Sequence, residues 1–255
     1  MGTTFIFQIA DSDDDAKTAD TVEVACTILD DADHMFSLYK PESEVSLLNS
    51  GKLSWGEAST TQIDVKQQVD KWMSITEGYF NPVSPEGVYD PSGLVKTWAT
   101  RNAAIYLEAN GYRDFTINAG GDIYIGPNVS TFPLTRVGLS NLKPISSKDA
   151  AVNMVLDLEG SDFRAVATSG SAERGEHIWA GKSSEAPKEF VQATVAALDI
   201  LTADIWATAL IAGGLEALHL FESKVDPSVA VAMVTTANGK IISTSGFSQI
   251  LANLK

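Results

Sequence analysis

The order of hydrophobic patterns along the chain is the feature that most restricts its fold. Apolar residues recur at helical spacing through most of residues 16–110, whereas strand patterns gather after residue 114. A regular βαβ alternation would spread helices and strands evenly, so this order indicates the α+β class. We predict one unit spanning residues 1–255, with a helix-rich part (1–113) tightly interlocked with a strand-rich part (114–255).

The spacing of apolar residues and the positions of turn residues predict the helices and strands. Helices are predicted at Ala16–Phe36, Glu42–Asn49, Thr61–Glu77, Gly93–Asn110 and Ala203–Ala212, with a second helix after Gly213-Gly214 that runs to Phe221. Strands are predicted at Thr3–Ile9, Phe115–Ile125, Val137–Ser140, Val152–Leu158, Arg164–Ser169, Val229–Thr235 and Lys240–Ser243. The last two flank Asn238-Gly239, a strong hairpin signal.

Composition narrows the classes of partner. The formal net charge is −15, from 33 acidic and 18 basic residues, and the sequence contains no run of Lys and Arg. Nucleic acids and anionic lipids need clustered cations, so neither is an expected partner. The single cysteine, Cys26, excludes an intrachain disulfide, and its apolar neighbours favour an inert thiol over a nucleophile.

The same composition bears on localisation. No apolar run approaches the length of a membrane span, and the first residues carry no basic segment. We expect a cytoplasmic protein without a membrane-spanning segment. The alternative is an exported protein whose signal sequence precedes the sequence given.

Asp204 and Thr208 are candidate metal ligands. They lie four positions apart, so on a helix the carboxylate and the hydroxyl share one face. Mg²⁺ prefers oxygen ligands and leaves positions for substrate phosphates, so the pair forms a plausible half-site. The alternative is an Asp that caps the helix start and a surface Thr.

Paired glycines interrupt an apolar strand pattern in Asn118-Ala119-Gly120-Gly121-Asp122. Glycine weakens a strand, so the pair indicates either close approach by a nucleotide or another backbone, or a bulge or tight bend. The segment lacks the third glycine and the following helix of a dinucleotide fingerprint.

Small hydroxyl residues end another strand in Ala167-Thr168-Ser169-Gly170-Ser171, ahead of His177. They suit contacts with phosphate, and they suit an ordinary turn equally well. No nucleophile-elbow pattern supports a Ser/His/Asp triad here. His34 and His219 fall in helical stretches and are expected to be structural.

Taken in order, these motifs resemble the FAD:protein FMN transferase family, the ApbE-like proteins, over nearly the whole chain. The matching pieces are Met1-Gly2-Thr3, Phe36–Tyr39 with Pro41, Ser43-Glu44 and Asn49, Gly78–Pro82, Asp90–Lys96, Asn118–Asp122, Ala167–Gly170, His177-Ile178 and Ala203–Leu210.

The resemblance implies a fold with a mixed, mainly antiparallel sheet, flanking helices and an N-terminal helical part that closes over an FAD site. It implies a Mg²⁺-dependent enzyme that cleaves FAD, attaches FMN to a Thr or Ser of an acceptor flavoprotein and releases AMP. The metal would be held by the carbonyl of Gly93 with Asp204 and Thr208, and His177 would lie near the reacting phosphate. FAD would contact Met1, Tyr39, Tyr79, Phe80, Asn81, Asp90, Lys96 and Ile178. Lys96 would supply a charge or hold Asp90, and Tyr39 and Phe80 would stack on rings.

The chain also departs from the family pattern, as a shortened and divergent member. Asn81 stands where the family has Asp, Thr97 replaces a glycine, Arg101 occupies an acidic position, and Trp179–Lys182 replaces an Asp-Pro-Arg-like continuation. The segment between Pro82 and Asp90 is shorter than usual. Alternatives to transfer are therefore an FAD pyrophosphatase that yields FMN and AMP, and a non-catalytic protein that binds or delivers FAD.

Overall fold

The computed structural model describes residues 2–128, 134–140, 152–170 and 189–252 of the chain. Its helices are α1 (Asp15–Phe36), α2 (Glu44–Asn49), α3 (Thr60–Ile75), α4 (Ser92–Ala109), α5 (Ile200–Lys224) and the short 3₁₀ helix η2 (Phe247–Ile250). Its strands are β1 (Phe5–Ile9), β2 (Phe115–Ala119), β3 (Asp122–Ile125), β4 (Arg136–Ser140), β5 (Val152–Asp157), β6 (Ala165–Gly170), β7 (Phe190–Ala197), β8 (Ala230–Thr236) and β9 (Ile241–Ser243).

Side-chain caps fix where several helices begin. The Asp14 carboxylate accepts hydrogen bonds from the backbone N–H groups of Ala16 and Lys17 at the start of α1. Ser59 caps α3 and Asp199 caps α5 in the same way. Such caps satisfy backbone donors that have no partner inside the helix, so they define the helix starts.

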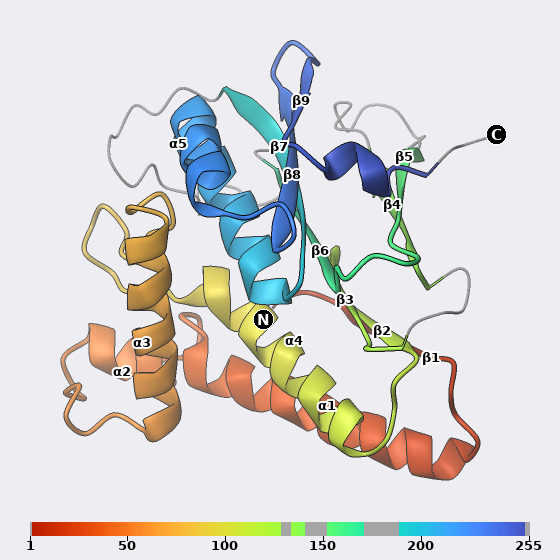
Figure 1. Ribbon diagram of the computed structural model, residues 1–255. Coiled ribbons are helices and arrows are strands. Elements are labelled where there is room, and N and C mark those ends of the chain that lie inside the picture. Colours follow the sequence, from red (N-terminus) through yellow and green to blue (C-terminus); the bar gives the residue numbers. More distant parts are fainter. Residues whose placement is uncertain (1, 129–133, 141–151, 171–188, 253–255) are drawn as a thin grey trace.

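Seven strands form one sheet in the order β1-β2-β3-β6-β7-β8-β9, and every neighbouring pair is antiparallel. β4 and β5 form a separate antiparallel pair. Figure 1 shows the α-helices on one side of the large sheet, with α1 beside α4 and α5 running along β6 and β7, and η2 on the other side near β4 and β5. The predicted α+β class with a mainly antiparallel sheet is confirmed.

Each face of the large sheet contributes to a separate core. Ala167, Val195 and Ala232 belong to the core on the helix side. Val166, Ala196 and Val231 belong to a second core, shared with β4, β5 and η2. The central strands are therefore buried on both faces, and the helix side is where α4 and α5 meet the sheet.

Two strand predictions need correction. The predicted strand Phe115–Ile125 is two strands, because Gly120 and Gly121 form a two-residue turn with φ values of 62° and 102°. The tight-bend interpretation of the glycine pair is therefore correct. β7 was not predicted at all, although its residues Val191 to Val195 alternate between apolar and polar, which is the pattern of a strand.

Gly120 also allows a close approach by the neighbouring strand. A Cβ there would lie 2.0 Å from Thr3 Oγ1, and the Gly120 N–H donates to the carbonyl of Thr4. The group packed closest to Gly120 is therefore a side chain, and the backbone contact with Thr4 is an ordinary hydrogen bond.

α5 is the one described helix that is long and apolar enough to cross a membrane by length and composition. However, 72 % of its most apolar window is buried inside the structure, where it packs on β6 and β7. Burial on all sides explains a hydropathy this high in a core helix.

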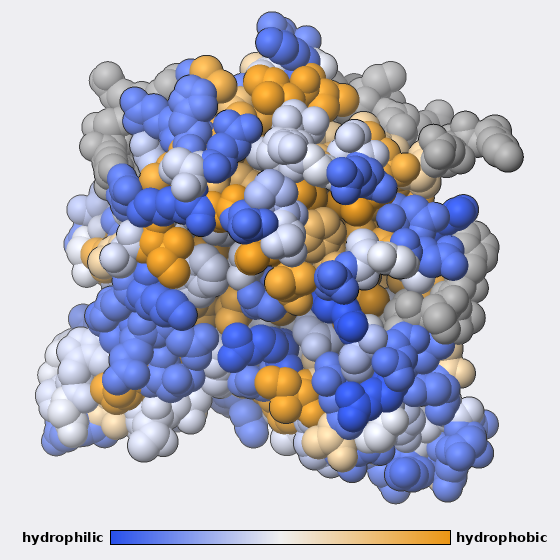
Figure 2. All heavy atoms as spheres, in the orientation of Figure 1, coloured by the Kyte–Doolittle hydropathy of each residue, from blue (hydrophilic) through white to orange (hydrophobic). Residues whose placement is uncertain are grey.

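The surface carries apolar residues in scattered positions. On the face in Figure 2, apolar areas (orange) are separated by hydrophilic side chains (blue). Tyr39, in the turn after α1, is 88 % exposed, and Ile105 and Ile241 are about half exposed. Single exposed apolar residues of this kind are common on soluble folds.

Candidate functional site

A buried lysine lies between two buried aspartates where α4 and α5 meet the sheet. The Lys96 ammonium on α4 contacts Asp122 Oδ2 at the start of β3 and lies 3.6 Å from Asp204 Oδ2 on α5. The side chains of Lys96, Asp122 and Asp204 are 12 %, 1 % and 0 % exposed. Charges so deeply buried must be paired, so this cluster is held in one arrangement.

Two further donors hold the carboxylates. The Thr97 hydroxyl, fully buried, donates to Asp204 Oδ2 at 3.2 Å. The backbone N–H of Thr168 on β6 donates to Asp122 Oδ1, also at 3.2 Å. Four separate elements therefore position the two acidic groups.

Asp204 and Thr208 lie one turn apart on α5, as the sequence predicts. Thr208 Oγ1 lies 3.3 Å from Ser169 Oγ at the end of β6, and Ser169 is fully buried. Asp199 is the N-terminal cap of α5, so Asp204 is an interior helical residue and the capping alternative is wrong. Gly93 lies in the first turn of α4, whose next turn carries Lys96 and Thr97.

The loop between α3 and α4 carries four more predicted residues. Tyr79 and Phe80 are buried, with 8 % and 3 % exposed, and the Phe80 ring packs against Gly93, where a Cβ would lie 3.2 Å from Cε2. The Asn81 side chain accepts from the backbone N–H of Val83. Asp90 accepts from the N–H of Ser92 at the start of α4. These contacts order the loop, and Phe80 presents little open ring surface for stacking.

Lys96 does not hold Asp90, which was one of its two expected roles. In the described part of the chain its ion pairs are with Asp122 and Asp204. Among the expected ring-stacking residues, Tyr39 alone is widely exposed.

Three predicted residues, Met1, His177 and Ile178, lie outside the described residues, as does the segment 179–182. Conversely, the structure adds Asp122, Thr97 and Ser169 to the site. Each stood in a segment that the sequence had marked, but contact with Asp204 or Thr208 depends on residues far away in the chain.

The side chains of this site do not resemble a metal site made of acidic, His and Cys ligands. Within residues 2–128, 134–140, 152–170 and 189–252, no group of three or more such side chains could hold an ion. A metal held here would depend on a mixed set of one carboxylate, hydroxyls and backbone oxygen. Those are the donors that Mg²⁺ accepts when substrate phosphates complete its shell.

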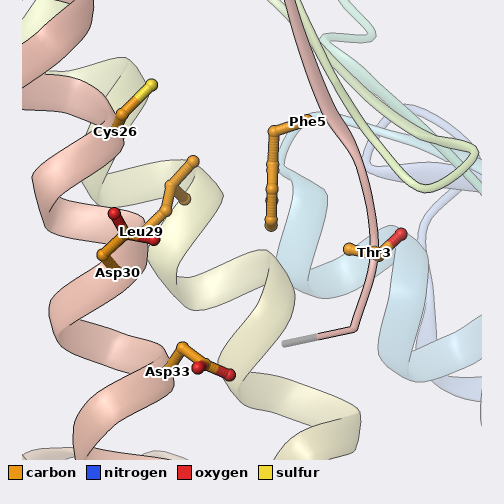
Figure 3. Close-up of a pocket in the computed structure, with 6 residues that line it drawn as sticks. All are labelled: Thr3, Phe5, Cys26, Leu29, Asp30 and Asp33. Carbon is orange, nitrogen blue, oxygen red and sulfur yellow. The ribbon is translucent and has the colours of Figure 1, made fainter.

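A pocket of about 170 Å³ lies between β1 and α1 (Figure 3). Its lining residues are Thr3, Phe5, Cys26, Leu29, Asp30 and Asp33. Thr3 also packs against Gly120, in the turn that precedes Asp122. Burial, with the charges of Asp30 and Glu23, raises the pKa of the Cys26 thiol, which disfavours a reactive thiolate.

We expect the contribution of Tyr79 to the free energy of unfolding to be lost in alkali. Its hydroxyl donates to Glu216 Oε2 at 2.8 Å, and burial, that bond and the charges of Glu216 and Glu77 raise the pKa of Tyr79 to about 12. Because the folded value exceeds the unfolded value of about 10, the contribution is complete below pH ~10 and is lost as the pH rises to ~12. Urea unfolding across this range should show a weaker pH dependence for Tyr79→Phe than for wild type. Equal slopes would contradict the assignment.

Solved structures with the same fold cover nearly the whole chain. The flavin transferase ApbE from Vibrio cholerae is 20 % identical, with a TM-score of 0.73 over 98 % of this chain and 96 % of that one. The ApbE protein from Thermotoga maritima is 17 % identical, with a TM-score of 0.76 over 98 % and 96 %. The flavinyl transferase ApbE from Pseudomonas stutzeri is 16 % identical, with a TM-score of 0.75 over 99 % and 95 %.

Comparison with curated proteins finds no significant match. The model of the ApbE family, in contrast, matches residues 1–89 and 83–233, which include the whole Lys96–Asp122–Asp204 cluster and Thr208. Since these two matches span far more than half of the sequence, the chain belongs to the ApbE family.

Proposed function

We propose that the chain is an FAD:protein FMN transferase. It would cleave the diphosphate of FAD, join FMN through a phosphoester to a Thr or Ser hydroxyl of an acceptor flavoprotein, and release AMP. The observation that carries the proposal is the buried cluster of Lys96, Asp122 and Asp204, beside Thr208, in a chain of this family. Its structural relatives are described as flavin transferases, which supports the same activity here.

The residues present suit Mg²⁺ by their donor chemistry. The Asp204 carboxylate and the Thr208 hydroxyl share one face of α5, and Ser169 Oγ lies 3.3 Å from Thr208 Oγ1. With the carbonyl of Gly93, which the family resemblance implies as a ligand, they would form an all-oxygen set suited to a hard cation. When bound, Mg²⁺ would neutralise charge that develops on the diphosphate.

The chain's own groups would divide the remaining work. The Lys96 ammonium provides a fixed positive charge beside Asp204, and Thr97 holds the Asp204 carboxylate in place. In the transfer, the acceptor oxygen bonds to the FMN phosphorus, the bond from that phosphorus to the bridging oxygen breaks, and AMP leaves. The hydroxyl proton must go to a base, and His177 is our candidate from its place in the family motif.

The pocket between β1 and α1 is a candidate place for one part of FAD. Its volume of about 170 Å³ suits one part of a large nucleotide, because whole ligand sites usually reach 300–1,000 Å³. FAD would thus extend beyond it, and Tyr39 is exposed to make the contact that the family resemblance implies.

Product analysis tests the proposal. The purified chain is incubated with FAD, Mg²⁺ and an acceptor flavoprotein domain, with an acceptor whose target Thr is replaced by Ala as the control. Transfer predicts AMP without free FMN, and an increase in the mass of the intact acceptor alone. Free FMN with AMP would instead identify an FAD pyrophosphatase. Bound FAD with neither product would identify a flavin-binding or delivery protein.

A further inference from the structure

Lys96 shares a carboxylate with the proposed metal. Its ammonium contacts Asp122 and lies 3.6 Å from Asp204 Oδ2, and all three side chains are almost completely buried. Asp204 is also the only acidic side chain in the proposed Mg²⁺ set. A divalent cation on Asp204 would therefore bind a carboxylate that already has a positive charge beside it.

Two positive charges at one buried carboxylate repel each other strongly, because the protein interior screens charge much less than water does. The repulsion falls when negative charge enters the same site. The diphosphate of FAD brings that charge, and its oxygens can contact both the ammonium and the metal.

We propose that Lys96 makes divalent-cation binding at Asp204 conditional on the diphosphate of FAD. The inference rests on the proposed function and deepens it. Without the nucleotide, the ammonium lowers the affinity of Asp204 for the metal, and with the nucleotide the metal binds firmly. By reciprocity of linked equilibria, the metal raises the affinity for FAD by the same factor, typically 5- to 150-fold.

The geometry separates this role from simple pairing of buried charges. Asp122 already pairs with Lys96 and is itself held by the Thr168 N–H, which fixes one end of the arrangement. Asp204 receives the Thr97 hydroxyl as well as the more distant ammonium. Lys96 thus acts on Asp204 through its charge, which predicts a gain of metal affinity when the charge is removed. A purely structural lysine predicts a loss or no change.

Mn²⁺ provides a direct probe, because the electron paramagnetic resonance signal of free Mn²⁺ reports binding without any turnover. In the absence of FAD, Lys96→Met should bind Mn²⁺ at least about tenfold more tightly than wild type. Lys96→Arg keeps the charge and should bind as weakly as wild type. Lys66→Met, which removes a half-buried lysine paired with Asp70, is the matched control and should leave Mn²⁺ binding unchanged.

Two further measurements test whether the added Mn²⁺ affinity arises at Asp204 and whether the variants remain folded. The double variant Lys96→Met/Asp204→Asn should lose the added affinity, which assigns it to Asp204. Mn²⁺ should raise the melting temperature of Lys96→Met more than that of wild type, and Lys96→Gln gives the same comparison with a polar side chain.

The outcomes separate this inference from the proposed function. If wild type binds Mn²⁺ only with FAD, and neither Lys96→Met nor Lys96→Gln gains affinity without FAD, the conditional role of Lys96 is overturned. If wild type binds Mn²⁺ equally well with and without FAD, it is overturned too. If neither wild type nor any variant binds Mn²⁺ even with FAD, the magnesium part of the proposed function fails with it.

Discussion

Replacing Asp204 by Asn should lower Mg²⁺-dependent FAD turnover about 100-fold or more while the protein stays folded. Asn keeps the size of the side chain and one carbonyl oxygen, but it removes the charge of the only carboxylate in the proposed metal set. Metal stabilisation of a developing negative charge contributes several kcal/mol, and each ~1.4 kcal/mol is a factor of ten in rate. Lys96 retains its contact with Asp122, so the buried ammonium keeps a partner.

The measurement is FAD turnover across a Mg²⁺ titration, with the melting temperature recorded for each variant. Asp199→Asn on the same helix is the matched control, because Asn is a nearly equivalent helix cap and this change should have little effect. Thr208→Val removes one hydroxyl and should give a smaller loss, of about tenfold. Wild-type turnover by Asp204→Asn at the same Mg²⁺ concentration would show that the metal assignment is wrong.

Gly214→Ala should destabilise the fold by roughly 2–4 kcal/mol and lower Tm by roughly 5–15 °C. Gly214 has φ 56° and ψ −137° inside α5, a conformation that side-chain-bearing residues rarely adopt. A Cβ there would lie 2.2 Å from Glu189 Oε2, the oxygen that accepts the Leu215 N–H after the kink. The substitution therefore adds backbone strain and displaces a charged hydrogen-bond partner.

Urea or thermal unfolding checks this result. Gly56→Ala is the control, because a Cβ at Gly56 meets only Ser54 Oγ at 3.9 Å and its φ is not positive. Its stability should change by less than about 0.5 kcal/mol. If Gly214→Ala is as stable as Gly56→Ala, then α5 has another way to bend at this position.

Much of the fold could be predicted because local signals were strong. The pair Gly213-Gly214 predicted a break in the helix, and α5 has a kink there. Asn238-Gly239 predicted a hairpin, and β8 and β9 form one. Helix starts moved by one to three residues where a capping side chain set the boundary, as Ser59 does for α3 and Asp199 for α5. β7 was missed although Val191 to Val195 alternate between apolar and polar residues, because the run is short and its side chains are mostly small.

The site was predictable in part for a related reason. Asp204 and Thr208 share a helical face, which spacing alone reveals. The partner of Lys96 was not predictable, because Asp122 reaches it only after the turn at Gly120-Gly121 brings β3 alongside β2. Likewise, the hydroxyl of Thr97 meets Asp204 only through the packing of α4 against α5.

The contact between Thr97 and Asp204 joins residues 107 positions apart, and Lys96 and Asp122 are joined across 26. Contacts between such distant positions require large loops to close first, which slows folding and delays those contacts. During synthesis, the segment that carries Lys96 and Asp122 leaves the ribosome well before Asp204 does. A nascent chain that ends before α5 therefore contains Lys96 and Asp122, which are buried in the folded protein, but lacks Asp204. The ability to bind a nucleotide should thus be acquired in one late step, once α5 docks on β6 and β7.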